Sequence, residues 1–236
     1  MSFSEIKKIS LINMKNHWIK LSLITLIYLL FNFSINLIPI VGFVFMFIFS
    51  TPISYGYILS LIKTINNEKI SVIDFLILGF KNTGKAWRII GNVFVRLFIP
   101  ILILFGFAVL VAYNSLPILE ALINNTLTLD IEISPFITIG LLGYIITLIY
   151  IAYKFLSYSL CFYLMIDYPQ ENGSFIVKKS TMFMKGKILK LIGFFLSFIG
   201  WIILSILTFG IGFVLLIPYI YISLYYFYKN ISPETV

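Results

Sequence analysis

The chain has 236 residues, of which 61% are hydrophobic and only 11% are charged, and its formal net charge is +8. Soluble domains are about 45–50% apolar and about 25% charged, so this composition lies far outside their range. An apolar excess of this size cannot be buried in one water-soluble core, and a bilayer has to act as the solvent. The composition therefore excludes a cytosolic globular enzyme and predicts an integral membrane protein with several spans.

Few residues are available for catalysis or metal binding. The sequence holds one cysteine, Cys161, and one histidine, His17, so neither an internal disulfide nor a Cys/His metal cluster can form. None of the nine acidic residues lies in a long apolar run, where proton-coupled pumps usually keep one. Walker, dinucleotide-binding and nucleic-acid-binding motifs are also missing. We therefore expect no catalytic site, no cofactor, no metal and no nucleic-acid partner.

Six apolar runs are long enough to cross a bilayer, which takes about 20 residues per helix. Their richness in Phe, Ile and Leu favours helices over the short alternating strands of a membrane barrel. The runs cover residues 18–39, 41–62, 89–113, 136–153, 191–208 and 211–228. We therefore predict an all-α integral membrane protein whose six transmembrane helices form three hairpins.

The hairpins and their flanking segments are expected to form a single transmembrane domain over residues 1–236, with a basic interfacial helix before each hairpin. In chain order the expected parts are an interfacial helix (2–17), a hairpin (18–62), a short cytoplasmic helix with the third span (71–113), an external loop (114–135), the fourth span with an interfacial extension (136–169), a second interfacial helix (174–187) and a last hairpin (191–228).

Two of these boundaries rest on local signals. Ser71 with Asp74 three residues later fits a helix N-cap, so a short helix is expected from there through Leu78. The apolar character after Phe136 continues well past Lys154, which makes one straight helix too long for the bilayer. A bend near Lys154 is therefore expected.

The positions of the cations predict the topology. The connections at 38–42, 114–135 and 208–212 contain no Lys or Arg, whereas the opposite ends of the spans carry nearly all of them. Positively charged segments stay in the cytoplasm. We therefore expect both termini to be cytoplasmic.

An internal repeat becomes visible when the start of the chain is aligned with its C-terminal third. Residues 6–44 match 176–214 without a gap at 12 of 39 positions. The segment Gly84–Arg88 resembles Gly186–Lys190 in the same way. The repeat hypothesis is three parallel copies of a basic helix followed by a hairpin. The alternative is convergent hydropathy combined with positive-inside charge placement.

Polar residues within the spans are the candidate functional residues. Arg96 lies about 12 Å deeper than Arg88 along a helix, where a lipid-facing guanidinium would be costly. Asn92 lies one turn before it, and Asn32 and Asn36 form a similar pair in the first span. Together they could line a polar path. The alternative is a snorkelling arginine with amides that hold helices together.

The basic helices are candidates for contact with anionic lipid headgroups, which attract each nearby cation by about 1 kcal/mol. The residues concerned are Lys7, Lys8, Lys15, Lys178, Lys179, Lys185 and Lys187. The simpler alternative is that these lysines only determine the topology of the chain in the membrane. Other expected partners are a membrane protein or a second copy of the chain.

Several segments resemble one bacterial family of polytopic membrane proteins, domain-of-unknown-function family 975. The resemblance is carried by Tyr158–Leu164, Lys179–Ser180, Met184–Gly186, Leu196–Trp201, Leu207–Gly212 and Ile217–Tyr219. It implies an integral protein of the bacterial plasma membrane and brings no activity with it.

Composition and resemblance together lead to two functional hypotheses. The first is a non-enzymatic protein that acts on membrane-embedded cargo, lipid or partner proteins, for example as an accessory or self-protection component of an export system. The second is a small transporter or channel with a polar path near Arg96. A lipid-modifying enzyme is a weak third, because no acid, histidine or cysteine lies at a suitable membrane depth.

Overall fold

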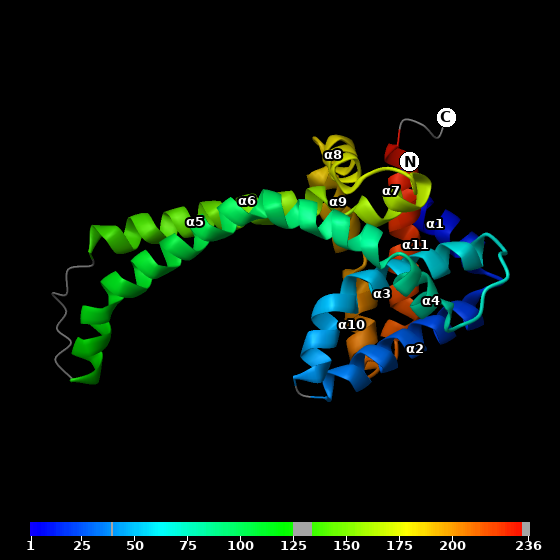
Figure 1. Ribbon diagram of the computed structural model, residues 1–236, viewed down its shortest axis with the longest axis horizontal. Helices are drawn as coiled ribbons and strands as arrows, with labels where there is room; N and C mark the ends of the chain where they lie inside the picture. The colour runs from blue at the N-terminus through cyan, green and yellow to red at the C-terminus, as the bar shows by residue number, and fades with distance from the viewer. Residues whose placement is uncertain (39, 125–133, 233–236) are drawn as a thin grey trace.

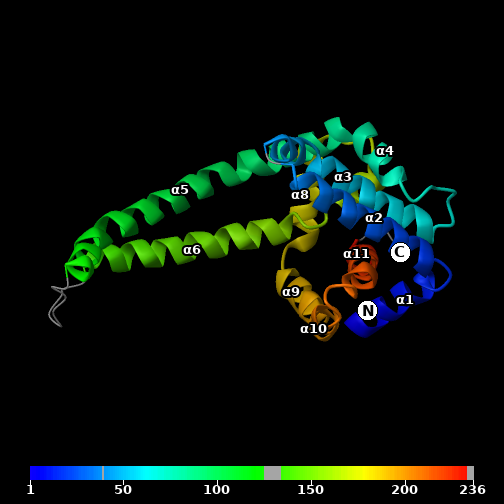
Figure 2. The ribbon, with the colours of Figure 1, turned by 90° about the horizontal axis from the view of Figure 1, so that it is seen from below.

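The computed structural model describes residues 1–38, 40–124 and 134–232, and these residues form helices without any strand. The predicted all-α class is confirmed. The helices are α1 (Phe3–Met14), α2 (Trp18–Asn36), α3 (Val41–Ile65), α4 (Asp74–Lys81), α5 (Thr83–Ile123), α6 (Pro135–Ser157), α7 (Cys161–Asp167), α8 (Gly173–Met184), α9 (Ile188–Leu196), α10 (Ile199–Leu207) and α11 (Phe213–Ile231). Helices α5 and α6 extend side by side away from a cluster formed by the others (Figures 1 and 2).

Five helical segments of the described chain are long and apolar enough to cross a membrane. They are Trp18–Asn36, Gly42–Ile65, Thr83–Ile123, Pro135–Asp167 and Ile188–Leu207. The sixth expected span, residues 211–228, corresponds to α11, which is not among them. Five tyrosines between positions 219 and 228 lower its hydropathy, and much of its surface is covered by other helices.

The hairpin of α5 and α6 is longer than the sequence predicted. Helix α5 has 41 residues and includes positions 114–123, which we expected in the external loop. The segment stays largely apolar, and the side chains of Asn114 and Ser115 donate to carbonyl oxygens of Leu110 and Ala112 within the same helix, so they need no partner outside it. Residues 125–133 of the expected loop lie outside the described residues, and α6 begins at Pro135.

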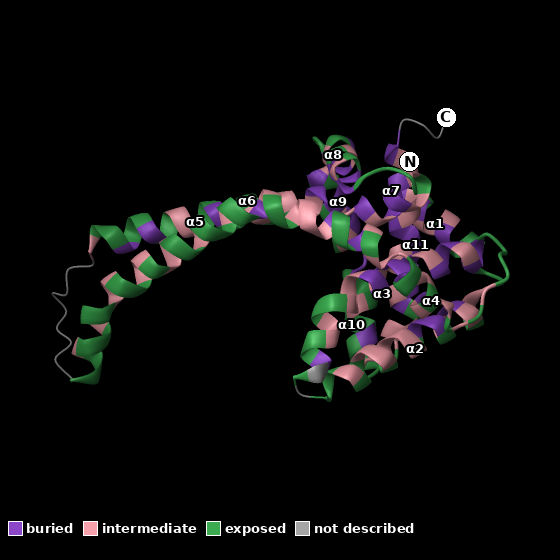
Figure 3. Cartoon of the chain, in the orientation of Figure 1, coloured by how far each residue is buried: buried purple, intermediate pink, exposed green. Residues whose placement is uncertain are grey.

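Buried side chains are concentrated in the cluster, whereas the α5–α6 hairpin shows mostly exposed and intermediate residues (Figure 3). Tyr57 on α3, Tyr163 on α7 and Phe227 on α11 are almost fully buried. Burial of such large rings supplies most of the contact energy of a helical core. The core therefore lies where α3, α7 and α11 meet.

The short helices α1, α4 and α8 each pack against one of the longer helices. Helix α1 contacts α11, α4 contacts α3, and α8 contacts α5. The α3–α4 contact is especially close: a Cβ atom on Gly79 would lie 2.8 Å from the Pro52 carbonyl oxygen, and one on Gly56 would meet the α4 backbone. Small residues allow helix backbones to approach in this way.

The beginnings of α1 and α8 correspond in the register that pairs 6–44 with 176–214. Ser2 caps α1 by accepting a 3.2 Å hydrogen bond from the Glu5 N–H, and Asn172 caps α8 by accepting a 2.8 Å bond from the Phe175 N–H. The Ser2 N–H in turn donates to the Glu5 carboxylate at 2.7 Å. These bonds to Ser2 lower the pKa of Glu5 below its usual value.

The correspondence continues through both helices and into the following hairpins. Buried residues of α1 reappear in α8 in the same register, and the tight turns of both hairpins place a glycine against the helix before it. The matched pairs are Ile6/Ile176, Ser10/Ser180, Met14/Met184, Leu21/Leu191 and Gly42/Gly212. Helix α2 corresponds to α9 and α10 together, with a break at Ser197 and Phe198 in the second set only.

Two local expectations differ in detail from the structure. Helix α4 begins at Asp74 and continues to Lys81, beyond the expected end at Leu78, and the Ser71 N–H donates a 2.7 Å bond to the Asp74 carboxylate. Helix α6 continues through Lys154 to Ser157, so the break in the chain falls at Tyr158–Leu160, slightly after the expected position. Helix α7 follows this break, and most of its side chains are buried.

Candidate functional site

A half-open pocket of about 400 Å³, called the central cavity below, lies where α3, α5, the α6–α7 junction and α11 meet. Its wall on α3 carries the hydroxyl groups of Ser50, Thr51 and Ser54, grouped around Pro52. Ile89, Ile90 and Val93 of α5 form an apolar wall. The remaining lining residues are Ile58, Phe155, Tyr158, Ser159, Cys161, Phe162, Tyr163, Tyr221 and Leu224.

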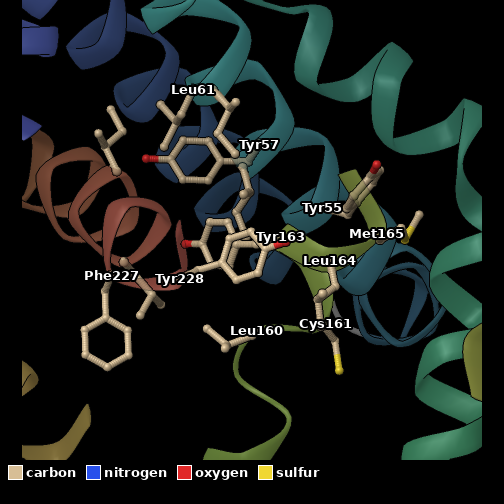
Figure 4. Close-up of a cluster of buried hydrophobic side chains, with 14 of the residues drawn as sticks. Tyr55, Tyr57, Leu61, Leu160, Cys161, Tyr163, Leu164, Met165, Phe227 and Tyr228 are labelled. Atoms are coloured by element: carbon tan, nitrogen blue, oxygen red, sulfur yellow. The ribbon is translucent and has the colours of Figure 1, made fainter. Parts of the chain in front are cut away.

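A tyrosine cluster stands beside this cavity, and Figure 4 shows Tyr57, Tyr163 and Tyr228 at its centre. The Tyr57 hydroxyl is 2.8 Å from the Thr25 hydroxyl, and Tyr163 donates a 3.0 Å hydrogen bond to the carbonyl oxygen of Tyr221. Buried phenols are stable only with such partners. The cluster therefore fixes α2, α3, α7 and α11 relative to one another.

An apolar groove lies on the other side of α11, between α10 and the junction of α1 with α2. Its volume is about 470 Å³, and Trp18 and Trp201 are among its lining residues. The other lining residues are Leu11, Leu204, Ser205, Thr208, Gly212, Leu215, Leu216 and Tyr219. A second apolar groove of about 330 Å³ between α2 and α11 shares Trp18 and Leu215 with it. No periodic pattern in the sequence marks either groove, because the lining residues come from several helices.

The candidate polar-path residues do not line a common pocket in the structure. Arg96 donates a 3.4 Å hydrogen bond to the Ser174 hydroxyl, which joins α5 to α8. Asn92 donates to the Arg88 carbonyl oxygen, Asn32 to that of Tyr28 and Asn36 to that of Asn32. Each amide thus bonds within its own helix, and none of the four residues lines the central cavity or the apolar groove.

The seven candidate headgroup lysines fall into two groups. Lys7 donates to the Ser197 carbonyl oxygen at 2.6 Å, Lys187 donates to that of Ile231 at 3.3 Å, and Lys179 lies 3.7 Å from the centre of the Tyr168 ring. The first two neutralise carbonyl groups at the ends of α9 and α11. Partial burial lowers the pKa of Lys7. The second group is exposed and consists of Lys8, Lys15, Lys178 and Lys185.

Metal-ligating side chains are dispersed: within residues 1–38, 40–124 and 134–232, no group of three or more His, Cys, Asp or Glu is placed to hold an ion. Asp167 instead accepts hydrogen bonds from Tyr228 at 2.5 Å and from Lys229 at 2.7 Å, which joins α7 to the end of α11.

The fold and its apolar helices define an all-helical protein with several helices able to span a membrane. The sequence profile of the family described as "Protein of unknown function (DUF975)" matches residues 1–235, and the chain belongs to this family. Neither a curated protein nor a solved structure shows significant similarity to the chain. The family resemblance noted in the sequence is thereby confirmed.

Proposed function

We propose that this chain is a non-enzymatic protein of the bacterial plasma membrane that acts on membrane-embedded molecules, and that it does so by holding a lipid in the apolar groove beside α11. The observation that carries the proposal is the groove itself, whose lining is almost entirely apolar. A groove of this kind on a membrane-facing surface fits a hydrocarbon chain and offers nothing to a water-soluble substrate.

Charge on α1 supports an anionic lipid as the occupant. Leu11 lines the groove, and Lys8 and Lys15 are three residues before it and four after it, so all three share one face of α1. Both lysines are exposed. A lipid whose acyl chain enters the groove would place its headgroup near these ammonium groups, each worth about 1 kcal/mol of attraction.

The proposal puts six spans in the bilayer, with α11 as the sixth and both termini in the cytoplasm. Helix α11 is antiparallel to the α9–α10 segment, as its short connection requires, and ends near Lys229. The absence of Lys and Arg from 38–42, 114–135 and 208–212 supports an external position for these connections.

An ancient duplication accounts for the matched features of α1–α3 and α8–α11. Caps, buried positions and turn glycines coincide in one constant register, in which 6–44 pairs with 176–214. Similar hydropathy alone would not place the helix caps and the turn glycines at equivalent positions in the two segments. The unit of α4, α5 and α6 is the third copy in this proposal, with its hairpin lengthened.

Native mass spectrometry tests the lipid proposal. Protein purified in mild detergent should carry about one phosphatidylglycerol per chain. Leu215→Phe, which fills both grooves, should release it, whereas Ile146→Phe on the exposed face of α6 should not. Lys8→Gln combined with Lys15→Gln should lower the affinity for phosphatidylglycerol by about 30-fold. Equal lipid retention by all four proteins would contradict the proposal.

A lipid-holding protein is compatible with several roles. It could serve as an accessory to an export system, as a self-protection component, or in complex with a membrane-protein partner or a second copy of the chain.

A transporter or channel is the second candidate function. It is favoured by the position of Arg96 on α5, the helix that also forms the apolar wall of the central cavity. Planar-bilayer conductance in KCl tests it: a channel predicts currents that Arg96→Gln abolishes in inserted protein, and currents no larger than those of protein-free bilayers would exclude a KCl-conducting channel.

A further inference from the structure

Helix α1 meets the α9–α10 segment through side chains that follow one another at one-turn intervals. The Phe3 ring packs edge-on against the Phe194 ring, with 5.9 Å between the ring centres. One turn later, Lys7 donates a 2.6 Å hydrogen bond to the Ser197 carbonyl oxygen. After a further turn, Leu11 lines the apolar groove. Lys7 therefore lies between a packed contact of the two segments and the groove that separates them.

The Ser197 carbonyl oxygen belongs to the break between α9 and α10. The N–H of the same residue still donates to the Gly193 carbonyl oxygen. The helical pattern resumes where the Ile202 N–H donates to the Phe198 carbonyl oxygen at 2.9 Å. Within the described chain, the Lys7 ammonium is the donor to the Ser197 oxygen between these two bonds. Because a carbonyl group without a donor is costly in a membrane, this ammonium replaces a bond that an unbroken helix would supply from its own backbone.

The Lys7 ammonium also contacts a ring beside the groove. It lies over the Phe198 ring, 3.9 Å from the ring centre, as in a cation–π interaction. The Phe198 ring packs against that of Tyr219, whose centre is 5.3 Å away, and Tyr219 lines the groove. Trp201, another lining residue, follows Phe198 by three positions. One cation on α1 is thereby linked to two residues of the groove wall.

Both sides of this contact depart from the repeat alignment. Lys7 aligns with Val177, which is fully buried. The break at 197–198 aligns with 27–28, which lie within the unbroken helix α2. A lysine and a helix break that each occur in only one of the two aligned segments therefore meet each other. A lysine that only marks the cytoplasmic side of the membrane needs no such partner.

We propose that Lys7 is a positioning residue for the apolar groove: its ammonium holds the start of α10 and thereby sets the width of the groove between α1 and α10. The proposal rests on the lipid site proposed for this groove. Without the ammonium, the broken segment loses a hydrogen-bond donor and a cation–π contact, and α10 is free to move relative to α1. The groove then holds lipid less tightly, although Lys7 itself is not among its lining residues.

Distances between two spin labels test this role in the full chain, purified in mild detergent. In a Cys161→Ser background, nitroxides at Ile12→Cys on α1 and Ile206→Cys on α10 report the separation of the two helices. Both side chains are exposed and lie outside the groove lining. Lys7→Met, which keeps an apolar chain of similar length, should shift or broaden the distance distribution. Lys7→Arg, which keeps a cation, should leave it unchanged, as should the control Lys185→Met at an exposed lysine after α8.

A reference pair of labels separates a local movement of α10 from a loss of the fold. Labels at Ile12→Cys and at Phe43→Cys, an exposed position, join α1 to α3, and their distance should stay the same in Lys7→Met. Phosphatidylglycerol should bind about tenfold more weakly to Lys7→Met, the order expected for one lost charge-assisted hydrogen bond. Lys7→Arg should bind it like wild type.

An unchanged distance between α1 and α10 in Lys7→Met would overturn the positioning role. A change at both label pairs, wild-type lipid affinity in Lys7→Met, or a Lys7→Arg variant that behaves like Lys7→Met would overturn it as well. In each of these cases the wild-type protein still binds phosphatidylglycerol, so the groove stands as a lipid site. A wild-type protein that binds no phosphatidylglycerol would instead refute the groove as a lipid site, and the effect of Lys7 on lipid binding with it.

Discussion

The indole N–H of Trp87 on α5 donates a 2.9 Å hydrogen bond to the backbone carbonyl oxygen of Ile48 on α3. This oxygen needs an outside partner because Pro52, four residues later in the same helix, has no N–H to donate. In a membrane such an unsatisfied carbonyl would be costly. The bond therefore compensates for a proline inside α3 and ties the second hairpin to the first.

Trp87→Phe should lower the stability of the detergent-solubilised protein by about 1–2 kcal/mol, because it leaves the Ile48 carbonyl oxygen without its donor. For a protein of this size the expected fall in Tm is about 2–8 °C. Pro52→Ala restores an N–H to the helix. In a Pro52→Ala background the loss of the Trp87 indole should therefore have little effect, and an undiminished fall in Tm would contradict this role.

The turn glycines provide a test of the proposed duplication. A Cβ on Gly42 would collide with the Ile35 carbonyl group, and one on Gly212 would lie 2.8 Å from the Cα of Ser205, the counterpart of Ile35 in the repeat alignment. Gly42→Ala and Gly212→Ala should each destabilise the protein by about 1–3 kcal/mol. Gly200→Ala is the control, since nothing lies within 4 Å of its Cβ position, and it should be neutral or stabilising. Tolerance of alanine at only one of the two turns would argue against equivalent hairpins.

The Arg96–Ser174 contact predicts a coupling between α5 and α8. Ser174→Ala and Arg96→Met should each lower the Tm, and the double variant should lower it by less than the sum, with a coupling of about 1 kcal/mol. Ser115→Ala, which removes a bond within α5 only, is the control partner and should show no coupling to Arg96→Met. Strict additivity at Arg96 and Ser174 would mean that the 3.4 Å contact contributes nothing.

Much of the fold follows from the sequence because apolar length and charge placement act through simple physical rules. Helix class and the spans of α2 and α3 need only a run of about 20 apolar residues. The start of α1 needs only Ser2 and Glu5 to form a capping box. These are local signals, and they hold in the folded chain.

The cavity and the groove depend on tertiary packing, and the sequence pattern alone could not reveal them. The cavity forms only because the α6–α7 junction lies against α3 and α11, and Trp18 and Trp201 line one groove only because α1 packs along α11. The polar-path residues show the limit of helical spacing as a signal. Their spacing predicts a shared face within each helix, but it does not reveal which pocket that face borders, and none of the four residues lines the central cavity or the apolar groove.

Cysteine accessibility in intact cells tests the proposed topology. In a Cys161→Ser background, single cysteines at Asn125 and Thr128 should react with a membrane-impermeant maleimide, because the connection they belong to is expected outside. Cysteines at Asn66 and Ser232 should not react in intact cells, and the cysteine at the exposed position 66 should react after the membrane is permeabilised. Labelling of position 232 in intact cells would contradict six spans with cytoplasmic termini.

Fluorescence quenching by dibrominated phosphatidylglycerol tests lipid binding in the groove most directly. The protein is titrated in detergent micelles with Trp201 as the sole tryptophan, after Trp18→Phe and Trp87→Phe. The account predicts saturable quenching at about one lipid per chain, and a linear, unsaturated response from a reporter in which Ile146→Trp replaces Trp201, on the exposed face of α6. Identical, unsaturated responses at the two positions would contradict a lipid site in the groove.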